Sequence, residues 1–281
     1  MDSNIRSATI ALRPLSPGDS ISAGIQLYRN HIKLYLTLSA VSHLWLLVPV
    51  YGWAKYIMTA GLMSRFAFQE LIDEPETVAQ SRAKLNARLW SFLWLVVQLG
   101  LRWIGVYILS MIALFFITAL FGLAIGVLVP VSPIFSVIGG FVILGTTLFF
   151  LYAIVRIFLR WYISDVPLSV EKGITAGQSI NRSWTLSQRL VGRIQIVIIL
   201  SFLVTWPLSV LTSLASRWMS QLLLDQLFLG LEGTFTAGWL IFVLGWAIGS
   251  IVLLPFWQII KAVMYYDFRC RQEGLDLELR H

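Results

Sequence analysis

Long apolar runs separated by short polar segments dominate the hydropathy pattern of this chain. Four of the runs have about the 20 residues or more that a membrane-spanning helix needs: residues 103–129, 134–155, 194–215 and 235–257. A fifth run, residues 34–63, is too long for one span and contains Pro49, whose ring breaks a helix. We therefore predict two crossings there, with the turn at Pro49 and a returning helix over residues 51–69. The pattern predicts an all-α, polytopic membrane protein with about six transmembrane helices.

Two amphipathic surface helices are predicted beside these spans. The first begins at the motif SPGD, which offers Ser16 as a capping hydroxyl, a first-turn proline and an acid three residues after the cap. Apolar residues then recur at helical spacing on one face: Ile21, Ile25, Tyr28 and Ile32. We expect this helix to lie along the inner membrane surface or to lead into the first span.

The second surface helix is predicted around the stretch ITAGQSINR, which begins at Ile174 and shares four of nine positions with ISAGIQLYR at Ile21. Its expected cap is Ser169, and its apolar stripe is Val170, Ile174, Gly177 and Trp184. In so biased a composition the likeness fits either a duplication or chance. A further segment, residues 89–102, fits either an interfacial helix before the third span or the first part of one unusually long helix.

Composition supports the membrane class. The chain has 281 residues, of which 58% are hydrophobic and 12% are charged, and a water-soluble core of this size cannot bury so much apolar surface. The first 20 residues are polar and contain Pro14 and Pro17, so we expect no cleaved signal peptide and a first apolar segment that is retained as an anchor. Cys270 is the only cysteine, which excludes an internal disulfide and a cysteine zinc cluster.

Basic residues set the predicted orientation, because short cytoplasmic loops are rich in Lys and Arg. They flank both ends of the first apolar run, and six of them lie between Arg156 and Arg193 against two acidic residues. The turn after Leu128 carries no charge, and residues 216–233 hold Asp225 and Glu232 against one arginine. We predict one membrane domain with both termini cytoplasmic, divided as follows: an N-terminal segment 1–33, a bundle 34–260 with cytoplasmic segments 70–88 and 161–193, and a tail 261–281.

Enzyme chemistry finds little support in the sequence. The histidines, His31, His43 and His281, are far apart and have no acid at ligand spacing. The motifs HExxH and GxSxG and a glycine-rich phosphate loop are absent. We therefore expect a protein that is not an enzyme and that holds no metal or cofactor.

Two polar features have structural interpretations. His43 lies on an apolar helix face, where a buried hydrogen-bonding role is more common than catalysis. Asp73, Glu74 and Glu76 surround a proline and are predicted to form the acidic first turn of a helix, whose positive end they would stabilise.

The charged residues at membrane depth or at its edge are basic, whereas every Asp and Glu falls outside the apolar cores. A carboxylate within a span is typical of proton-coupled carriers. Arginines at the cytoplasmic end of a span either snorkel to lipid phosphates or form a site for an anionic lipid or solute. The candidate contacts are Arg102, Arg156, Arg160, Arg182 and Arg193.

Two segments of the chain resemble segments of known protein families. DVPLSVEKGITAGQSINRSWTLSQRLVGR, which includes Pro167, Glu171 and Arg182, resembles the cytoplasmic segment of multi-span bacterial proteins grouped with the membrane domain of glycerophosphodiester phosphodiesterases. YYDFRCRQEGLDLELR, from Tyr265, is similar to the tail of cyanobacterial members. The resemblance covers under a fifth of the chain and implies a helical membrane domain without an assigned activity; the hydrolase module would be a separate domain.

Three function classes rank in a definite order. The first is a lipid-interacting or scaffold protein, whose partners are membrane lipids, anionic ones among them, and a membrane protein or a second copy of the chain. The tail mixes acidic and basic residues, which suits pairing with protein. A transporter for an anionic or amphipathic solute is the alternative, and an enzyme comes last. We expect the inner (plasma) membrane, or a thylakoid membrane if the cyanobacterial resemblance holds, and no nucleic-acid partner.

Overall fold

A computed structural model describes residues 15–128, 130, 132, 134–227 and 231–275. Within these ranges the regular structure is entirely helical, as predicted. The helices are α1 (Pro17–Asn30), α2 (Ile32–Trp45), α3 (Tyr51–Leu71), α4 (Val78–Asn86), α5 (Leu89–Leu128), α6 (Ile134–Trp161), α7 (Asp165–Val170), α8 (Ala176–Ser187), α9 (Val191–Leu227) and α10 (Leu231–Glu273). Parts of the predicted cytoplasmic termini, residues 1–14 and 276–281, lie outside the described residues, as do the side chains of Asp225 and Glu232.

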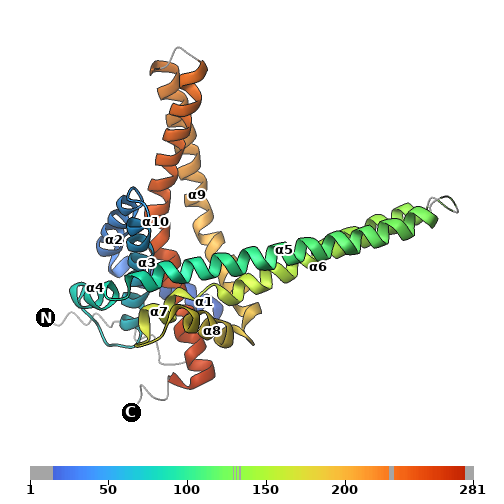
Figure 1. Cartoon of the computed structure of the whole chain (residues 1–281). Coiled ribbons are helices and arrows are strands. Elements are labelled where there is room, and N and C mark those ends of the chain that lie inside the picture. The colour runs from blue at the N-terminus through green and yellow to red at the C-terminus, as the bar shows by residue number, and fades with distance from the viewer. Residues whose placement is uncertain (1–14, 129, 131, 133, 228–230, 276–281) are drawn as a thin grey trace.

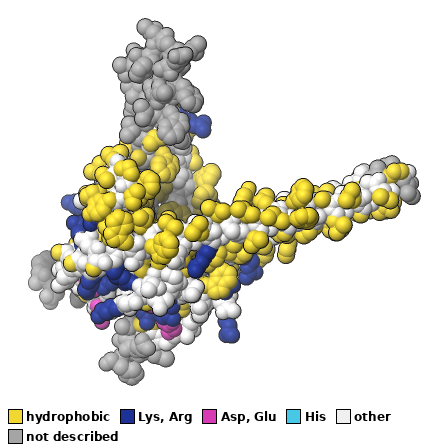
Figure 2. Space-filling model, in the orientation of Figure 1, with side chains coloured by type: hydrophobic (Ala, Val, Ile, Leu, Met, Phe, Trp, Pro, Cys, Tyr) yellow, Lys and Arg dark blue, Asp and Glu magenta, His cyan; other side chains and the backbone are white. Residues whose placement is uncertain are grey.

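Two long hairpins, α5–α6 and α9–α10, leave a common base and point in different directions (Figure 1). The base consists of α1, α4, α7 and α8 with the inner ends of α3, α5, α6, α9 and α10. A shorter hairpin, α2–α3, stands beside α10. Hydrophobic side chains cover the α5–α6 hairpin along its length, whereas Lys and Arg side chains gather on the base (Figure 2).

Four helical segments of the described chain are long and apolar enough to cross a membrane: Leu89–Leu128, Ile134–Val170, Val191–Trp218 and Gly245–Glu273. They correspond to the four apolar runs that the sequence marks most clearly. The predicted count of about six is not confirmed. Residues 89–102 belong to the 40-residue helix α5, which settles the sequence ambiguity in favour of one unusually long helix.

The α2–α3 hairpin differs from a pair of full spans. Its turn contains Pro49, as predicted, but α2 has 14 residues, or about 21 Å at 1.5 Å per residue, and so falls short of a hydrocarbon core of about 30 Å. In α3, 14 of 21 residues are buried against protein. The turn itself is tight: Val50 has φ 59°, and a Cβ atom on Gly52 would lie 1.8 Å from the carbonyl oxygen of Trp45. Only glycine fits at that position.

The inner half of α10 forms the centre of the base. Residues 261–273, predicted as part of a cytoplasmic tail, continue α10 without a break, and residues 259–268 are buried almost throughout. Burial of these apolar and aromatic side chains supplies most of the driving force for folding of the base. Among the largest fully buried side chains are Tyr35, Phe68, Phe92, Tyr265, Tyr266 and Phe268.

Helix α1 begins as the sequence predicts. Ser16 and Asp19 form a reciprocal capping box at its N-terminus, with a proline at the first position. The apolar face is rotated from the predicted one, because Gly24 packs against the side chain of Ile260 in α10. Of the four residues expected on that face, Ile21 is buried and Tyr28 is half-buried, while Ile25 and Ile32 are exposed.

The second surface helix begins later than predicted. Ser169 is buried within α7 and caps no helix; the cap of α8 is Thr175, which forms a capping box with Gln178. Gly173, at φ +75°, interrupts the expected continuous helix between them. ISAG therefore lies inside α1 whereas ITAG spans the start of α8, so the two stretches occupy different positions in their helices.

A buried ion pair joins α3 to the entrance of α4. Arg65 is 5% exposed. Its Nε donates to Oε2 of Glu76 at 2.8 Å, and its Nη2 donates to Oε1 of Glu76 at 2.6 Å. Arg65 also donates to the carbonyl of Ser169 in α7 at 2.7 Å. Glu76 thus precedes the helix instead of forming its first turn, and the cap of α4 is Thr77. The predicted acidic first turn is wrong, because Arg65 draws the carboxylate inward.

We expect this pair to make the stability of the protein fall in acid. The Arg65 hydrogen bond is the main cause that lowers the pKa of Glu76 to about 2, against an ordinary value of 4.5. A lowered folded-state pKa stabilises the fold above pH 4.5, and this contribution is lost as the pH falls toward 2. In thermal unfolding of the purified protein in detergent, the midpoint should therefore fall as the pH is lowered from 4.5 toward 2. The fall should be smaller in Glu76→Gln than in the unmodified protein. An unchanged pH profile in the variant would contradict the assignment.

Candidate functional site

The predicted arginines fall into two groups in the structure. Arg102, Arg156 and Arg160 lie where the α5–α6 hairpin leaves the base, and Arg156 and Arg160 each lie over an aromatic ring. The ring centroids of Trp103 and Trp161 are 5.8 Å apart, and Trp161 lies 5.7 Å from Trp184 of α8. We call this region the hairpin root, defined by Arg102, Trp103, Arg156, Arg160, Trp161 and Trp184.

Arg160 is the central residue of the hairpin root. Its guanidinium carbon lies 3.5 Å from the centroid of the Trp184 ring, a cation–π stack that arginine's planar group favours. The backbone carbonyl of Arg160, in the last turn of α6, accepts hydrogen bonds from Ser183 at 2.8 Å and from Ser187 at 3.2 Å. Helix α8 therefore fixes the end of α6 and supplies the ring that orients the arginine.

The guanidinium of Arg160 retains unused hydrogen-bonding capacity. Of its five N–H donors, only one finds a partner within the described chain, the Trp184 carbonyl at 3.3 Å. The Nε atom is buried and has no partner there. The buried Nε cannot reach an anion outside the protein, whereas the terminal nitrogens, which are not buried, are suited to receive an anionic oxygen.

Arg156 and Arg102 extend the same positive region. Arg156, one helical turn from Arg160, is exposed, donates to the Tyr152 hydroxyl at 3.0 Å and lies over the Tyr152 ring. Arg102 is half-buried and directly precedes Trp103, whose ring packs 4.8 Å from Phe158. The two arginines are thus placed at the level of Arg160 along the hairpin.

Arg182 and Arg193 point instead at carboxylates of this chain. Arg182 in α8 binds Glu171 at 2.9 Å and Glu273 at 2.5 Å. These carboxylates raise the pKa of the Arg182 guanidinium despite its partial burial, and they also place the end of α10 against α8. Its donors are therefore engaged inside the base, where they tie three segments together.

Arg193, at the start of α9, binds the buried carboxylate of Asp267 at 2.7 Å and also contacts the carbonyl of Leu15. Asp267 is 1% exposed and further accepts from the Leu15 N–H at 2.7 Å and from Arg271 at 3.1 Å. Because a buried carboxylate is costly without such partners, this cluster fixes α1 and α9 on α10.

A second polar cluster lies at the inner end of α3. His31, in the break between α1 and α2, lies 3.2 Å from Glu70, and both line a cavity of about 220 Å³. Burial raises the pKa of Glu70, and its contact with His31 acts in the opposite direction. One carboxylate oxygen of Glu70 is buried without a partner in the described chain. The cluster holds the α1–α2 break against α3.

His43 has the hydrogen-bonding role that the sequence predicts, although it is half-buried and not fully buried. Its Nδ1 lies 2.8 Å from the Ser39 carbonyl, and its Nε2 lies 2.8 Å from the Ser250 hydroxyl of α10. Nδ1 therefore carries the proton, and the residue links α2 to α10. Sequence reasoning missed this partner because 207 positions separate the two residues.

Sequence reasoning also missed the aromatic side of the hairpin root and the acidic partners inside the base. The tryptophans gave a usable signal, because Trp and Tyr gather at membrane–water interfaces together with Arg. No such local signal marked Asp267 or Glu171 as partners of distant arginines.

Comparison of the chain with protein-family models, with curated proteins and with solved structures gives no match. The resemblance noted in two sequence segments stays a prediction.

Stability measurements can test whether Arg193 has a structural role inside the base. Arg193→Gln removes one charged partner of buried Asp267 and should lower the free energy of unfolding by about 2 kcal/mol, the usual range for a hydrogen bond to a charged group. Arg189→Gln, at an exposed position with the same change of charge, is the matched control and should have almost no effect. Thermal unfolding in detergent measures both. Equal midpoints for the two variants would show that the Asp267 cluster does not stabilise the base.

Proposed function

We propose that this protein is a lipid-interacting membrane scaffold that binds an anionic lipid headgroup at the hairpin root. The proposal rests mainly on Arg160, which is stacked on Trp184 and has hydrogen-bond donors without a partner in the described chain, next to an apolar hairpin. Arg156 and Arg102 add positive charge at the same level. A guanidinium can hold a phosphate through two parallel hydrogen bonds, which a lysine cannot reproduce.

The position of the hairpin root favours a lipid over a soluble anion. In α5, none of the residues in the most apolar window is buried within the described protein, and in α6 only 6% are. Such a surface is compatible with a hydrocarbon environment and not with water. Arginines and tryptophans at its polar end would then lie at headgroup depth, where each basic residue near an anionic surface contributes about 1 kcal/mol.

The proposal includes a topology. The base faces the cytoplasm of the inner membrane, both termini lie on that side, and the α5–α6 and α9–α10 hairpins cross the bilayer and return. The α2–α3 hairpin enters from the base and returns, since its turn exposes large apolar side chains: Leu44, Leu47, Val50 and Trp53. A full crossing by this hairpin, and hence six spans, stays a prediction. The folded, charge-paired base provides the surface for scaffold contacts with a membrane protein or a second copy.

Native mass spectrometry of the purified protein with phosphatidylglycerol tests the headgroup site. Replacing both Arg156 and Arg160 by Gln should weaken retention of this anionic lipid by about fivefold per arginine. Lysine at both positions should give an intermediate loss, because the charge remains but the paired hydrogen bonds do not. Retention of phosphatidylethanolamine, which has no net charge, should change less.

Arg189→Gln is the control for loss of a positive charge elsewhere, since it removes one from an exposed site in the base without changing the hairpin root. It should retain phosphatidylglycerol as the unmodified protein does. Equal retention by the unmodified protein and by the Gln and Lys variants would contradict the site and leave these arginines with a purely structural role.

A further inference from the structure

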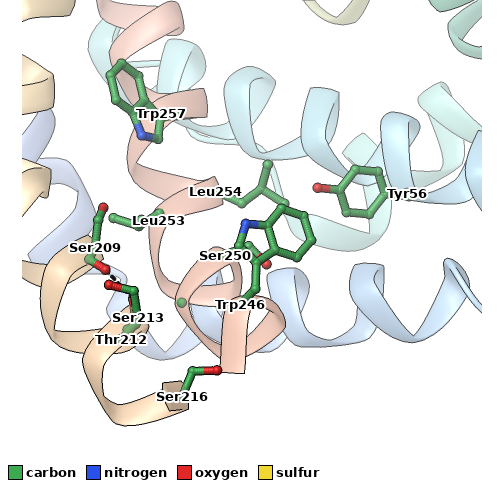
Figure 3. Close-up of a pocket in the computed structure, with 11 residues that line it drawn as sticks. Tyr56, Ser209, Thr212, Ser213, Ser216, Trp246, Ser250, Leu253, Leu254 and Trp257 are labelled. Carbon is green, nitrogen blue, oxygen red and sulfur yellow. Dashed lines mark hydrogen bonds between the residues drawn. The ribbon is translucent and has the colours of Figure 1, made fainter. Parts of the chain in front are cut away.

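A cavity of about 320 Å³ lies between α9, α10 and α3, away from the hairpin root. Its size falls at the small end of the range for small-molecule sites, about 300–1,000 Å³. The lining segments of α9 and α10 belong to the candidate membrane spans. Figure 3 shows side chains from the three helices converging on this space. Among the described residues that line it, none is charged.

One wall of the cavity presents hydroxyl groups from α9: Ser209, Thr212, Ser213 and Ser216. Three of them donate to carbonyls of their own helix, Ser209 at 3.1 Å, Thr212 at 3.1 Å and Ser213 at 2.9 Å. Their hydroxyl hydrogens are thereby used, and their oxygen lone pairs remain available. This wall therefore offers hydrogen-bond acceptors.

The rest of the lining offers hydrogen-bond donors and apolar surface. Leu253, Leu254 and Trp257 of α10 and Tyr56 of α3 also line the cavity; Figure 3 shows Leu253 and Trp257 on the side of Ser209 and Leu254 on the side of Tyr56. The Tyr56 hydroxyl and the Trp257 indole N–H have no hydrogen-bond partner within the described chain. Figure 3 shows the Tyr56 hydroxyl directed toward the α10 residues of the cavity. In a bilayer, which supplies no water, such donors are left without a partner unless a ligand provides one.

Close helix contacts fix the shape of the cavity. A Cβ atom on Gly245 would lie 2.4 Å from the Ser216 side chain, and one on Gly249 would lie 2.9 Å from the Thr212 hydroxyl. Ser250, in the lining, is held by His43 of α2. The walls are therefore set before any ligand enters, which reduces the ordering cost of binding.

We propose that this cavity binds an uncharged glycerolipid that keeps one free glycerol hydroxyl, as a diacylglycerol does. Ester carbonyl oxygens accept from Tyr56 and Trp257, the glycerol hydroxyl donates to the α9 wall, and an acyl chain lies along Leu253 and Leu254. The described lining residues carry no charge, which disfavours an ionised headgroup, since an unpaired ion at this depth is costly. The inference rests on the membrane embedding of α9 and α10 but is independent of the arginine site.

Binding of 1,2-dioleoylglycerol and of its diether analogue, which lacks both carbonyl oxygens, tests the proposal by native mass spectrometry in detergent. The unmodified protein should bind the diester more tightly, by about fivefold for each hydrogen bond to a carbonyl. Tyr56→Phe removes one hydroxyl and little else. It should weaken diester binding by about fivefold and leave diether binding unchanged. The ratio of the diester affinity to the diether affinity should therefore be smaller than in the unmodified protein.

Two tryptophan variants on α10 separate the cavity from the rest of the hairpin surface. Leu253→Trp fills the cavity and should abolish binding of both probes, whereas Ile248→Trp, at a position 63% exposed outside the lining, should not. Circular dichroism checks that each variant is folded; if Leu253→Trp is not, the Tyr56→Phe comparison still decides. Equal binding of diester and diether by the unmodified protein, or an unchanged ratio in Tyr56→Phe, would overturn the proposal. The Arg156 and Arg160 variants should bind dioleoylglycerol as the unmodified protein does. A failure of the cavity proposal can therefore be distinguished from a failure of the headgroup proposal.

Discussion

Paired carboxylates inside the base are the interactions on which the rest of this structure depends. Asp267 joins the start of α1, the start of α9 and the end of α10, and Glu76 joins α3, α4 and α7 through Arg65. A buried or half-buried carboxylate is stable only with such partners, so the pairs specify which segments meet. They connect segments that are scattered along the sequence between long apolar helices, around the apolar core that supplies most of the driving force for folding of the base.

The same arrangement accounts for the two hairpins. Within each hairpin the helices contact each other and the base. Apolar side chains cover the exposed surface of the α5–α6 hairpin (Figure 2), and the described part of α9 exposes others, such as Leu203, Trp206 and Leu211. Water is therefore an unsuitable solvent for them, and lipid is a suitable one. Side chains with both polar and apolar character belong at the boundary, and Arg160 on Trp184 lies there. The proposed headgroup site thus follows from where a charged base meets an apolar hairpin.

The sequence predicted the features that depend on local pattern. Apolar length identified the four long spans, and the capping motif at Ser16 placed the start of α1. Features that depend on distant partners could not be predicted: an isolated pattern cannot show that α3 is buried against protein, that Arg193 meets Asp267, or that His43 meets Ser250. Of the candidate site, the arginines were visible in the sequence, but their division into internal ion pairs and unsatisfied donors required the fold.

The central claim is that the base and the tip of the α5–α6 hairpin lie on opposite sides of the membrane. Single cysteines test it most directly, in a background where the buried Cys270 is replaced by Ala. One cysteine replaces Ser132 at the hairpin tip and the other replaces exposed Lys172 in the base. A membrane-impermeant maleimide should label the Ser132→Cys protein in intact cells and the Lys172→Cys protein only after permeabilisation. Labelling of both in intact cells, or of neither, would contradict the account.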